Sequence, residues 1–169
     1  MVQKWKLITS IAVPVIGGSI IGGVAAKSAK STYKQLNTPE LSPPSWVFPV
    51  AWTSLYATMG TAKYCFDQKP KAAGNQMMES ALYRAQLFFN FLWSFLFFRW
   101  NLRGAALFDA ILLWISILLN GYYFYLNSKT AAVLMLPYLG WVTYAVALNY
   151  NTWNDNKNLP ISIKNKKCR

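Results

Sequence analysis

AALFDAILLWISILLNGYYFYL, residues 105–126, carries a single charged side chain, that of Asp109. A helix needs about 20 predominantly apolar residues to cross a hydrocarbon core about 30 Å thick. Lipid offers no partner for backbone N–H and C=O groups, so a crossing segment of this length must bond them internally, as a helix does. This stretch therefore predicts a membrane helix, and it sets the fold class in which the rest of the chain is interpreted.

Similar apolar blocks stand on both sides of this stretch. We expect five membrane helices in all, at residues 7–26, 46–66, 80–98, 105–126 and 130–153. The connections are short, so consecutive helices should pack antiparallel. The sequence thus predicts an all-α integral membrane protein: one domain over residues 1–169, with a five-transmembrane-helix bundle, a lid loop at 27–45 and a basic cytosolic tail at 154–169.

Composition supports this class and excludes several others. The chain is 54% hydrophobic and 13% charged, whereas soluble domains are about 25% charged. Its net charge of +12 comes from basic residues between apolar blocks, so we expect the lipid membrane and not nucleic acid as partner. The chain has no histidine, which excludes imidazole chemistry. Its two cysteines fit neither a disulfide framework nor a metal site, and we expect no metal.

The basic residues also predict an orientation. Five crossings put the two termini on opposite sides of the membrane. Seven Lys and Arg residues lie on the side of the N-terminus, and ten lie on the side of the first loop and the C-terminal tail. The excess favours a cytosolic first loop and tail.

The third block places polar side chains on one helix face. Gln86, Asn90, Trp93 and Phe97 follow a spacing of four, three and four residues, which aligns them along a helix. Amides in a membrane segment need a partner. Either they form interhelical hydrogen bonds, worth about 0.6 to 2 kcal/mol in membranes, or they line a cavity, and both interpretations stay open.

Asp109 is the acid of the central stretch and shares a stripe with Ser116 and Asn120. A carboxylate inside a membrane segment is by default a candidate functional group. The alternative is structural: a charge at a helix N-terminus, or an ion pair with one of the nearby arginines, which are Arg84, Arg99 and Arg103.

Tryptophans and glycines mark further sites. Trp5, Trp100 and Trp153 fit the aromatic belt at the membrane surface. The other three that we single out lie a turn or more inside their blocks and predict an inward pocket: Trp52, Trp93 and Trp141. Two of these follow prolines, in the stripe from Pro49 to Lys63 and in the stripe Pro137, Trp141, Tyr144, Leu148. A small-xxx-small pair, Gly18 and Gly22, permits close helix packing within the bundle or across a dimer.

Two longer motifs carry a family resemblance. TPELSPPSWVFPVAWTSLYATMG (38–60) and LPYLGWVTYAVALNYNTWNDN (136–156) resemble the second and fifth helices of the translocator protein family, also called the TspO/MBR, tryptophan-rich sensory protein or peripheral-type benzodiazepine receptor family. Gln86, Asn90 and Trp93 fit its third-helix pattern, and Asp109 fits its fourth-helix acid. The matches run from about residue 33 to 156.

The resemblance implies a ligand-binding function. Family members are often homodimers and bind tetrapyrroles such as protoporphyrin IX, sterols, and isoquinoline or benzodiazepine-type drugs, with no obligatory cofactor. The matching pocket positions are Trp52, Asn90, Trp93, Trp141, Ala145 and Leu148. The matching lid positions are Pro39, Pro43, Pro44 and Trp46.

The resemblance leaves three functions open. The first is a membrane receptor or sensor, with protoporphyrin IX or haem as a ligand. The second is a porphyrin or cholesterol transporter. The third is a light-dependent porphyrin-degrading enzyme, in which Trp52 and Trp141 match the family's reacting tryptophans. Without histidine to ligate haem iron, we expect metal-free porphyrin to bind at least as well as haem.

The chain departs from the family pattern at two tryptophans and one sterol motif. Leu41 and Ala105 stand where members have tryptophan. The sterol pattern ending in Leu148, Tyr150 and Lys157 fails by one residue, so porphyrin is favoured over cholesterol.

The resemblance and the C-terminal tail suggest where the protein is located in the cell. Animal members of the family are proteins of the mitochondrial outer membrane, so the resemblance implies that location. The ending KKCR (166–169) resembles a retrieval signal of the endoplasmic reticulum and early secretory pathway, which is the alternative, and it also fits a basic tail at anionic lipid.

Overall fold

The structure is a computed structural model that describes residues 2–33, 42–44, 46–70 and 73–156. Five α-helices and one π-helix cover most of these residues: α1 Val2–Tyr33, α2 Val47–Asp67, α3 Ala73–Ser94, η1 Phe95–Arg99, α4 Arg103–Asn127 and α5 Lys129–Asn156. Four of the predicted blocks lie within one helix or begin one residue before it, and the block at 80–98 covers most of α3 and continues into η1. The prediction of an all-α chain is confirmed.

Two helices extend into segments that were predicted as lid loop and tail, and α1 and α3 also begin earlier than predicted, at Val2 and Ala73. α1 continues through residues 27–33, the first part of the predicted lid loop at 27–45. That segment, KSAKSTY, contains no Gly or Pro, so nothing in it stops a helix once the apolar run ends. α5 likewise takes in residues 154–156 of the predicted tail. An apolar run marks the part of a helix that can contact lipid, and both α1 and α5 extend beyond that part. The remainder of the tail, with residues 34–41 and 45, lies outside the described residues.

A π-helix follows α3, and the sequence analysis did not predict it. The N–H of Trp100 donates to the C=O of Phe95 over 2.9 Å, a bond that spans five residues instead of four. Asn101 then adopts a φ of 55°, in the left-handed region, and the chain turns into α4. π-Helical turns of this kind are rare in proteins overall, and those that occur often lie at functional sites.

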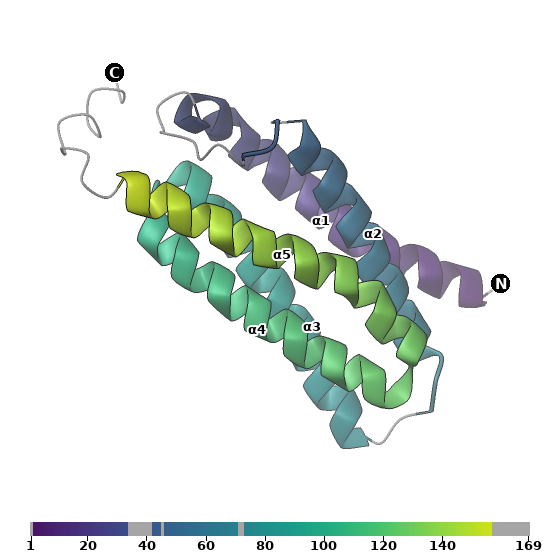
Figure 1. Cartoon of the computed structure of the whole chain (residues 1–169). Coiled ribbons are helices and arrows are strands. Elements are labelled where there is room, and N and C mark those ends of the chain that lie inside the picture. The colour runs from purple at the N-terminus through teal and green to yellow at the C-terminus, as the bar shows by residue number, and fades with distance from the viewer. Residues whose placement is uncertain (1, 34–41, 45, 71–72, 157–169) are drawn as a thin grey trace.

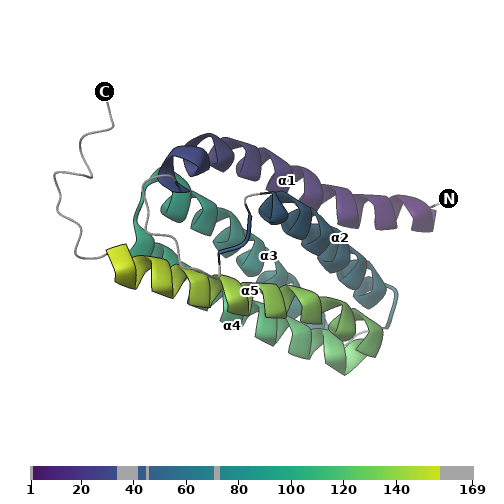
Figure 2. The same ribbon diagram turned by 45° about the horizontal axis from the view of Figure 1, so that its top comes forward.

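The five α-helices form a closed ring. α1 packs on α2, α2 on α5, α5 on α4, α4 on α3, and α3 with η1 returns to α1. Figures 1 and 2 show the α1–α2 pair on one side and the α4–α5 pair on the other. The first turn of α1 and the last turn of α5 lie at opposite ends of the bundle (Figure 1). α2 and α3 face each other across the ring, so long side chains have to bridge them.

Glycine brings α1 and α2 close together. A Cβ atom on Gly18 would overlap the ring of Tyr56, and one on Gly60 would overlap the backbone carbonyl of Ser10. A Cβ on Gly22 would meet nothing within 4 Å. Of the small-xxx-small pair, Gly18 therefore serves packing inside the bundle, and Gly22 makes no such contact within this chain.

The distribution of polarity is that of a protein in lipid. Three of the described helical segments are long and apolar enough to cross a membrane, namely Lys4–Val24, Arg103–Asn127 and Lys129–Asn156. Large apolar side chains are exposed on the outside, among them Ile16, Phe88, Phe108 and Leu136. Polar side chains such as Glu79, Gln86 and Asn120 are fully buried. α2 and α3 fall short of the same measure: α2 includes Trp, Tyr, Thr, Ser, Lys and Asp residues, and α3 includes Asn, Gln, Glu and Arg residues.

Candidate functional site

Aromatic side chains from α2, α3 and α5 meet inside the helix ring. Trp52 stacks on Tyr56, with ring centroids 5.8 Å apart and planes inclined by 29°. Its indole also lies 6.4 Å from Trp93 and 6.3 Å from Tyr138, centroid to centroid. We call Trp52, Tyr56, Asn90, Trp93 and Tyr138 the aromatic site. It joins helices that are far apart in the sequence.

Asn90 forms the polar centre of the aromatic site. Its side chain is 2% exposed. The hydroxyl of Tyr56 donates to its Oδ1 over 2.5 Å, and its Nδ2 donates to the hydroxyl of Tyr138 over 3.0 Å. The interhelical hydrogen bond that was one of the two interpretations of this face is therefore formed. It ties α2, α3 and α5 together at the same place as the aromatic rings.

Trp93 and Gln86 lie on the same buried face of α3 as Asn90. Trp93 is 8% exposed and stacks on Phe97 at 5.3 Å. Its Nε1 has no hydrogen-bond partner among the described residues. A buried donor left without a partner costs about 1 to 3 kcal/mol, so this N–H is available to a bound molecule. Gln86 offers its Nε2 to the sulfur of Met59 at 3.9 Å, and its Oε1 has no partner among the described residues.

α5 is rotated relative to the predicted stripe. The stripe Pro137, Trp141, Tyr144, Leu148 was expected to face inward, but Pro137 is exposed and the other three are half-buried. The most buried positions of α5 are Ala131, Tyr138, Val142 and Asn149, at 0 to 1% exposure. Tyr138, Val142 and Asn149 each follow a residue of the predicted stripe by one position, so the buried face is turned by about 100° around the helix.

The predicted α5 pocket residues border the aromatic site. Trp141 lies 6.2 Å from Phe48 of α2 and 5.7 Å from Tyr144, centroid to centroid. Ala145 and Leu148 are half-buried on the same side of α5 as Trp141. Trp141 is three residues from Tyr138, about one turn away, so these residues extend the site along α5.

Asp109 belongs to the buried face of α4, and two contacts of α4 with α5 give its height along the bundle. Two pairs give the register: Trp114 Nε1 donates to Thr143 Oγ1 over 2.8 Å, and a Cβ on Gly104 would lie 3.2 Å from Trp153 Nε1. Midway between these pairs, Asp109 is level with residues 148 and 149 of α5. It is 4% exposed, and its Oδ2 has no hydrogen-bond partner among the described residues.

The ion pair expected for Asp109 is not formed among the described residues, where both ion pairs involve Lys63. Arg84 donates to the carbonyl of Ser80 on its own helix, and Arg99 is exposed in η1. Arg103 begins α4 and is six residues from Asp109, which places it about 120° away around the helix. Asp109 is thus a buried carboxylate without a cation beside it.

The lid positions are only partly described. Pro39 and Leu41 lie outside the described residues. The carbonyl of Pro44 accepts the N–H of Val47 over 3.0 Å and begins α2, and Pro43 precedes it without regular structure. Trp46 is 66% exposed at this helix start, as an interfacial anchor would be.

The sequence analysis assigned no site role to the hydroxyls of Tyr56 and Tyr138. A signal was present, since Tyr56 follows Trp52 by one turn and Tyr138 lies between Pro137 and Trp141. Their common partner, Asn90, stands on a third helix, so no local pattern pairs them. Among the described residues no cluster of His, Cys, Asp and Glu could hold a metal ion. The site offers flat apolar faces and a few hydrogen-bonding groups.

Comparison with known proteins agrees with this architecture. The family model described as TspO/MBR family matches residues 10–154. The tryptophan-rich protein TspO of Archaeoglobus fulgidus is 38% identical over 145 residues, covering 86% of this chain and 93% of that protein. The tryptophan-rich sensory protein of Cereibacter sphaeroides is 38% identical over 128 residues, covering 76% and 78%. The translocator protein of Sus scrofa is 32% identical over 146 residues, covering 86% of each chain.

These matches span nearly the whole bundle, including every residue of the aromatic site. They confirm the family resemblance inferred from the motifs on α2, α3, α4 and α5. The chain is a membrane protein that belongs to the TspO/MBR family.

Proposed function

We propose that this protein is a membrane receptor or sensor that binds a tetrapyrrole such as protoporphyrin IX at the aromatic site. A membrane sensor or transporter role is supported by the family and by the names of its relatives, sensory protein and translocator protein. The observation that carries the ligand class is the meeting of Trp52, Trp93, Tyr56 and Tyr138 around the bonded amide of Asn90.

The chemistry of the site matches a flat, apolar ring system. Indole and phenol faces stack on aromatic rings with about 0.5 to 1.5 kcal/mol beyond the burial of area. The unpartnered N–H of Trp93 is a donor for a polar edge of the ligand. Trp52 and Trp141 are half-buried, so we expect them to move aside to admit the ring beneath the lid positions Pro39, Pro43, Pro44 and Trp46.

The residue types favour metal-free porphyrin over haem, because the chain has no histidine to ligate iron. Sterols and isoquinoline or benzodiazepine-type molecules are also flat and apolar, and we propose them as weaker ligands of the same site. Ala145 and Leu148 would contact their apolar portions.

Titration of the purified protein with protoporphyrin IX, followed by quenching of tryptophan fluorescence, tests this proposal. We expect Trp52→Leu to weaken binding about tenfold, since it removes one stacking face of the site. Trp5→Leu is the matched control, because Trp5 is 64% exposed on α1 and should leave the affinity unchanged. Equal affinity in wild type and Trp52→Leu, or much tighter binding of haem than of protoporphyrin IX, would contradict the proposal.

A light-dependent porphyrin-degrading activity is a second candidate, favoured by the proximity of Trp52 to Trp93 and Tyr56. Illumination of the complex in wild type, Trp52→Phe and Trp141→Phe separates it from binding alone, because decay no faster than in detergent excludes catalysis. Transport is separated by uptake of the same porphyrin into proteoliposomes.

The membrane topology and location follow from the same proposal. We propose that α2 and α3 cross the membrane beside α1, α4 and α5, so that the bundle has five crossings and works as a homodimer. The mitochondrial outer membrane is the proposed location, and the endoplasmic reticulum is the alternative because of the KKCR ending. Microscopy of forms tagged at the tail and internally distinguishes the two.

A further inference from the structure

A polar groove opens at the end of the bundle where α1 begins and α2 ends. Its volume is about 480 Å³, and its walls come from α1, the last turns of α2 and the start of α3. Lys63, one of its wall residues, is eleven positions from Trp52 along α2, a distance of about 16 Å at 1.5 Å per residue. The groove is therefore separate from the aromatic site.

The groove contains three lysines, and only one of them is paired. Lys63 Nζ lies 2.8 Å from Asp67 and 3.2 Å from Glu79, whose side chain is fully buried. Lys6 and Lys69 line the same groove and form no ion pair among the described residues. Asp67 and Glu79 are thus paired with Lys63, whereas the exposed ammonium groups of Lys6 and Lys69 have no ion-pair partner among the described residues.

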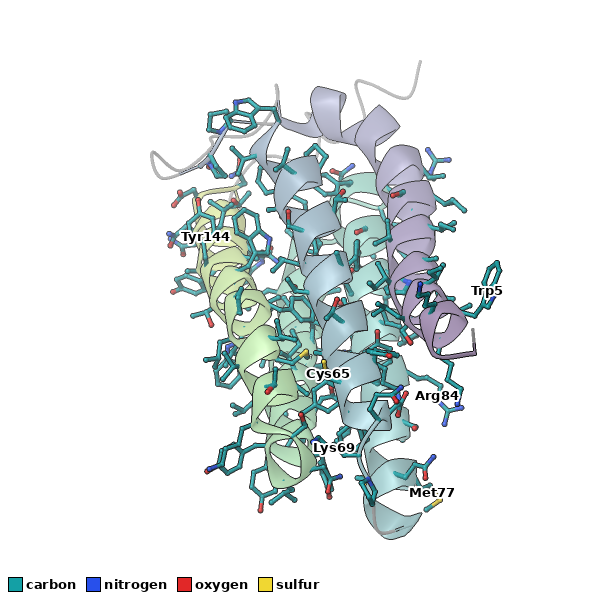
Figure 3. All side chains as sticks on the ribbon, turned by 90° about the vertical axis from the view of Figure 1, so that its right-hand side faces the viewer. Trp5, Cys65, Lys69, Met77, Arg84 and Tyr144 are labelled. Carbon is teal, nitrogen blue, oxygen red and sulfur yellow. The ribbon has the colours of Figure 1, made fainter. Side chains whose placement is uncertain are left out.

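The groove continues into an apolar stripe on α1. Lys6 and Thr9 are followed, at a spacing of four, three, four and four residues, by side chains that are 48 to 66% exposed: Val13, Ile16, Ile20 and Val24. This spacing keeps all six positions on one helix face. Trp5 points away from the bundle on the α1 side (Figure 3). An exposed tryptophan beside the start of an apolar span marks the level of the lipid headgroups.

We propose that this groove binds the headgroup of an anionic phospholipid. The phosphate lies between Lys6 and Lys69, and an acyl chain follows the α1 stripe into the membrane. The stripe favours a lipid over free phosphate, because an inorganic anion would use the groove alone. Each lysine near an anionic lipid surface contributes about a fivefold gain in affinity.

Native mass spectrometry of the purified full chain in detergent, titrated with phosphatidylglycerol or phosphatidylcholine, tests the proposal. We expect wild type to retain phosphatidylglycerol in preference to phosphatidylcholine. Lys6→Gln and Lys69→Gln should each weaken phosphatidylglycerol binding about fivefold. Ile16→Ser on the stripe should weaken it as well without altering the groove.

Lys129→Gln is the matched control. Lys129 is exposed at the start of α5 and does not line the groove, and its end of the bundle also carries the α2–α3 connection (Figure 1). It should leave lipid binding unchanged. Equal weakening by Lys129→Gln would show diffuse attraction and overturn the proposal. Two results together would instead indicate a site for small anions and overturn the lipid proposal. They are displacement of phosphatidylglycerol by inorganic phosphate or glycerol 3-phosphate at the same concentration, and unchanged phosphatidylglycerol binding in Ile16→Ser. The melting temperature of each variant without added lipid reports whether it has folded.

Discussion

Asn90 and Asn149 are both buried, at 2% and 1% exposure, but they belong to regions of different construction. In the aromatic site, both side-chain atoms of Asn90 are bonded, one to Tyr56 and one to Tyr138. On α5, at the level of Asp109, neither side-chain atom of Asn149 has a hydrogen-bond partner among the described residues. The first amide holds three helices together, whereas the second is available to a bound molecule. Burial alone does not distinguish these roles.

Asn90→Leu tests the first half of this comparison and should have the largest effect on stability. It leaves the hydroxyls of Tyr56 and Tyr138 buried without their partner, and each such group costs about 1 to 3 kcal/mol. We expect a loss of about 3 kcal/mol in the free energy of unfolding, measured by denaturant titration in detergent.

The control for Asn90→Leu is the triple variant that adds Tyr56→Phe and Tyr138→Phe. Removing all polar partners together leaves no unpaired group, so most of the lost stability should return. A single variant as stable as wild type would show that the three side chains do not hold the bundle together.

Gly60→Ala tests the packing of α1 on α2, next to the aromatic site. The new methyl group would overlap the backbone carbonyl of Ser10, and overpacking of this kind costs about 1 to 3 kcal/mol. Gly121→Ala on α4 is the control, because a Cβ there meets nothing within 4 Å. The melting temperature should fall for Gly60→Ala only. An equal fall for both variants would mean that helix propensity or lipid contact, and not the α1–α2 contact, causes the loss of stability.

The sequence predicted the helices well because they depend on local patterns. Apolar runs located all five α-helices, and the four-three spacing on α3 correctly grouped Gln86, Asn90 and Trp93 on a buried face. The cluster of Trp52 with Trp93 could be anticipated because both indoles lie well inside their helices.

Features that depend on other helices could not be predicted in the same way. The face of α5 that is buried depends on its packing against α2 and α4, which no local pattern reveals. The pairing of Lys63 with Glu79 joins α2 to α3 over sixteen positions. An ion pair with an arginine was one of the alternatives for Asp109, and no such pair forms among the described residues.

Trp114→Phe tests the α4–α5 contact at the hydrogen bond between Trp114 and Thr143. The change removes the N–H that donates to Thr143 Oγ1, and hydrogen bonds between membrane helices contribute about 0.6 kcal/mol on average. A double-mutant cycle with Thr143→Val should give a coupling energy of about that size. A coupling of zero would mean that the pair contributes nothing to the contact.

Asn149→Leu sharpens the other half of the comparison and should change the stability of the protein least. No hydrogen bond to a described residue is lost, and replacing an unpaired buried amide by an apolar side chain of similar size is close to neutral or stabilising. We expect a change within about 0.5 kcal/mol in the same denaturant titration used for Asn90→Leu. A loss as large as that of Asn90→Leu would show that the amide of Asn149 is bonded as firmly as that of Asn90, and the contrast between the two regions would fail. If stability holds but protoporphyrin IX binds more weakly, the amide of Asn149 belongs to the ligand site, which would then reach from the aromatic site further along α5.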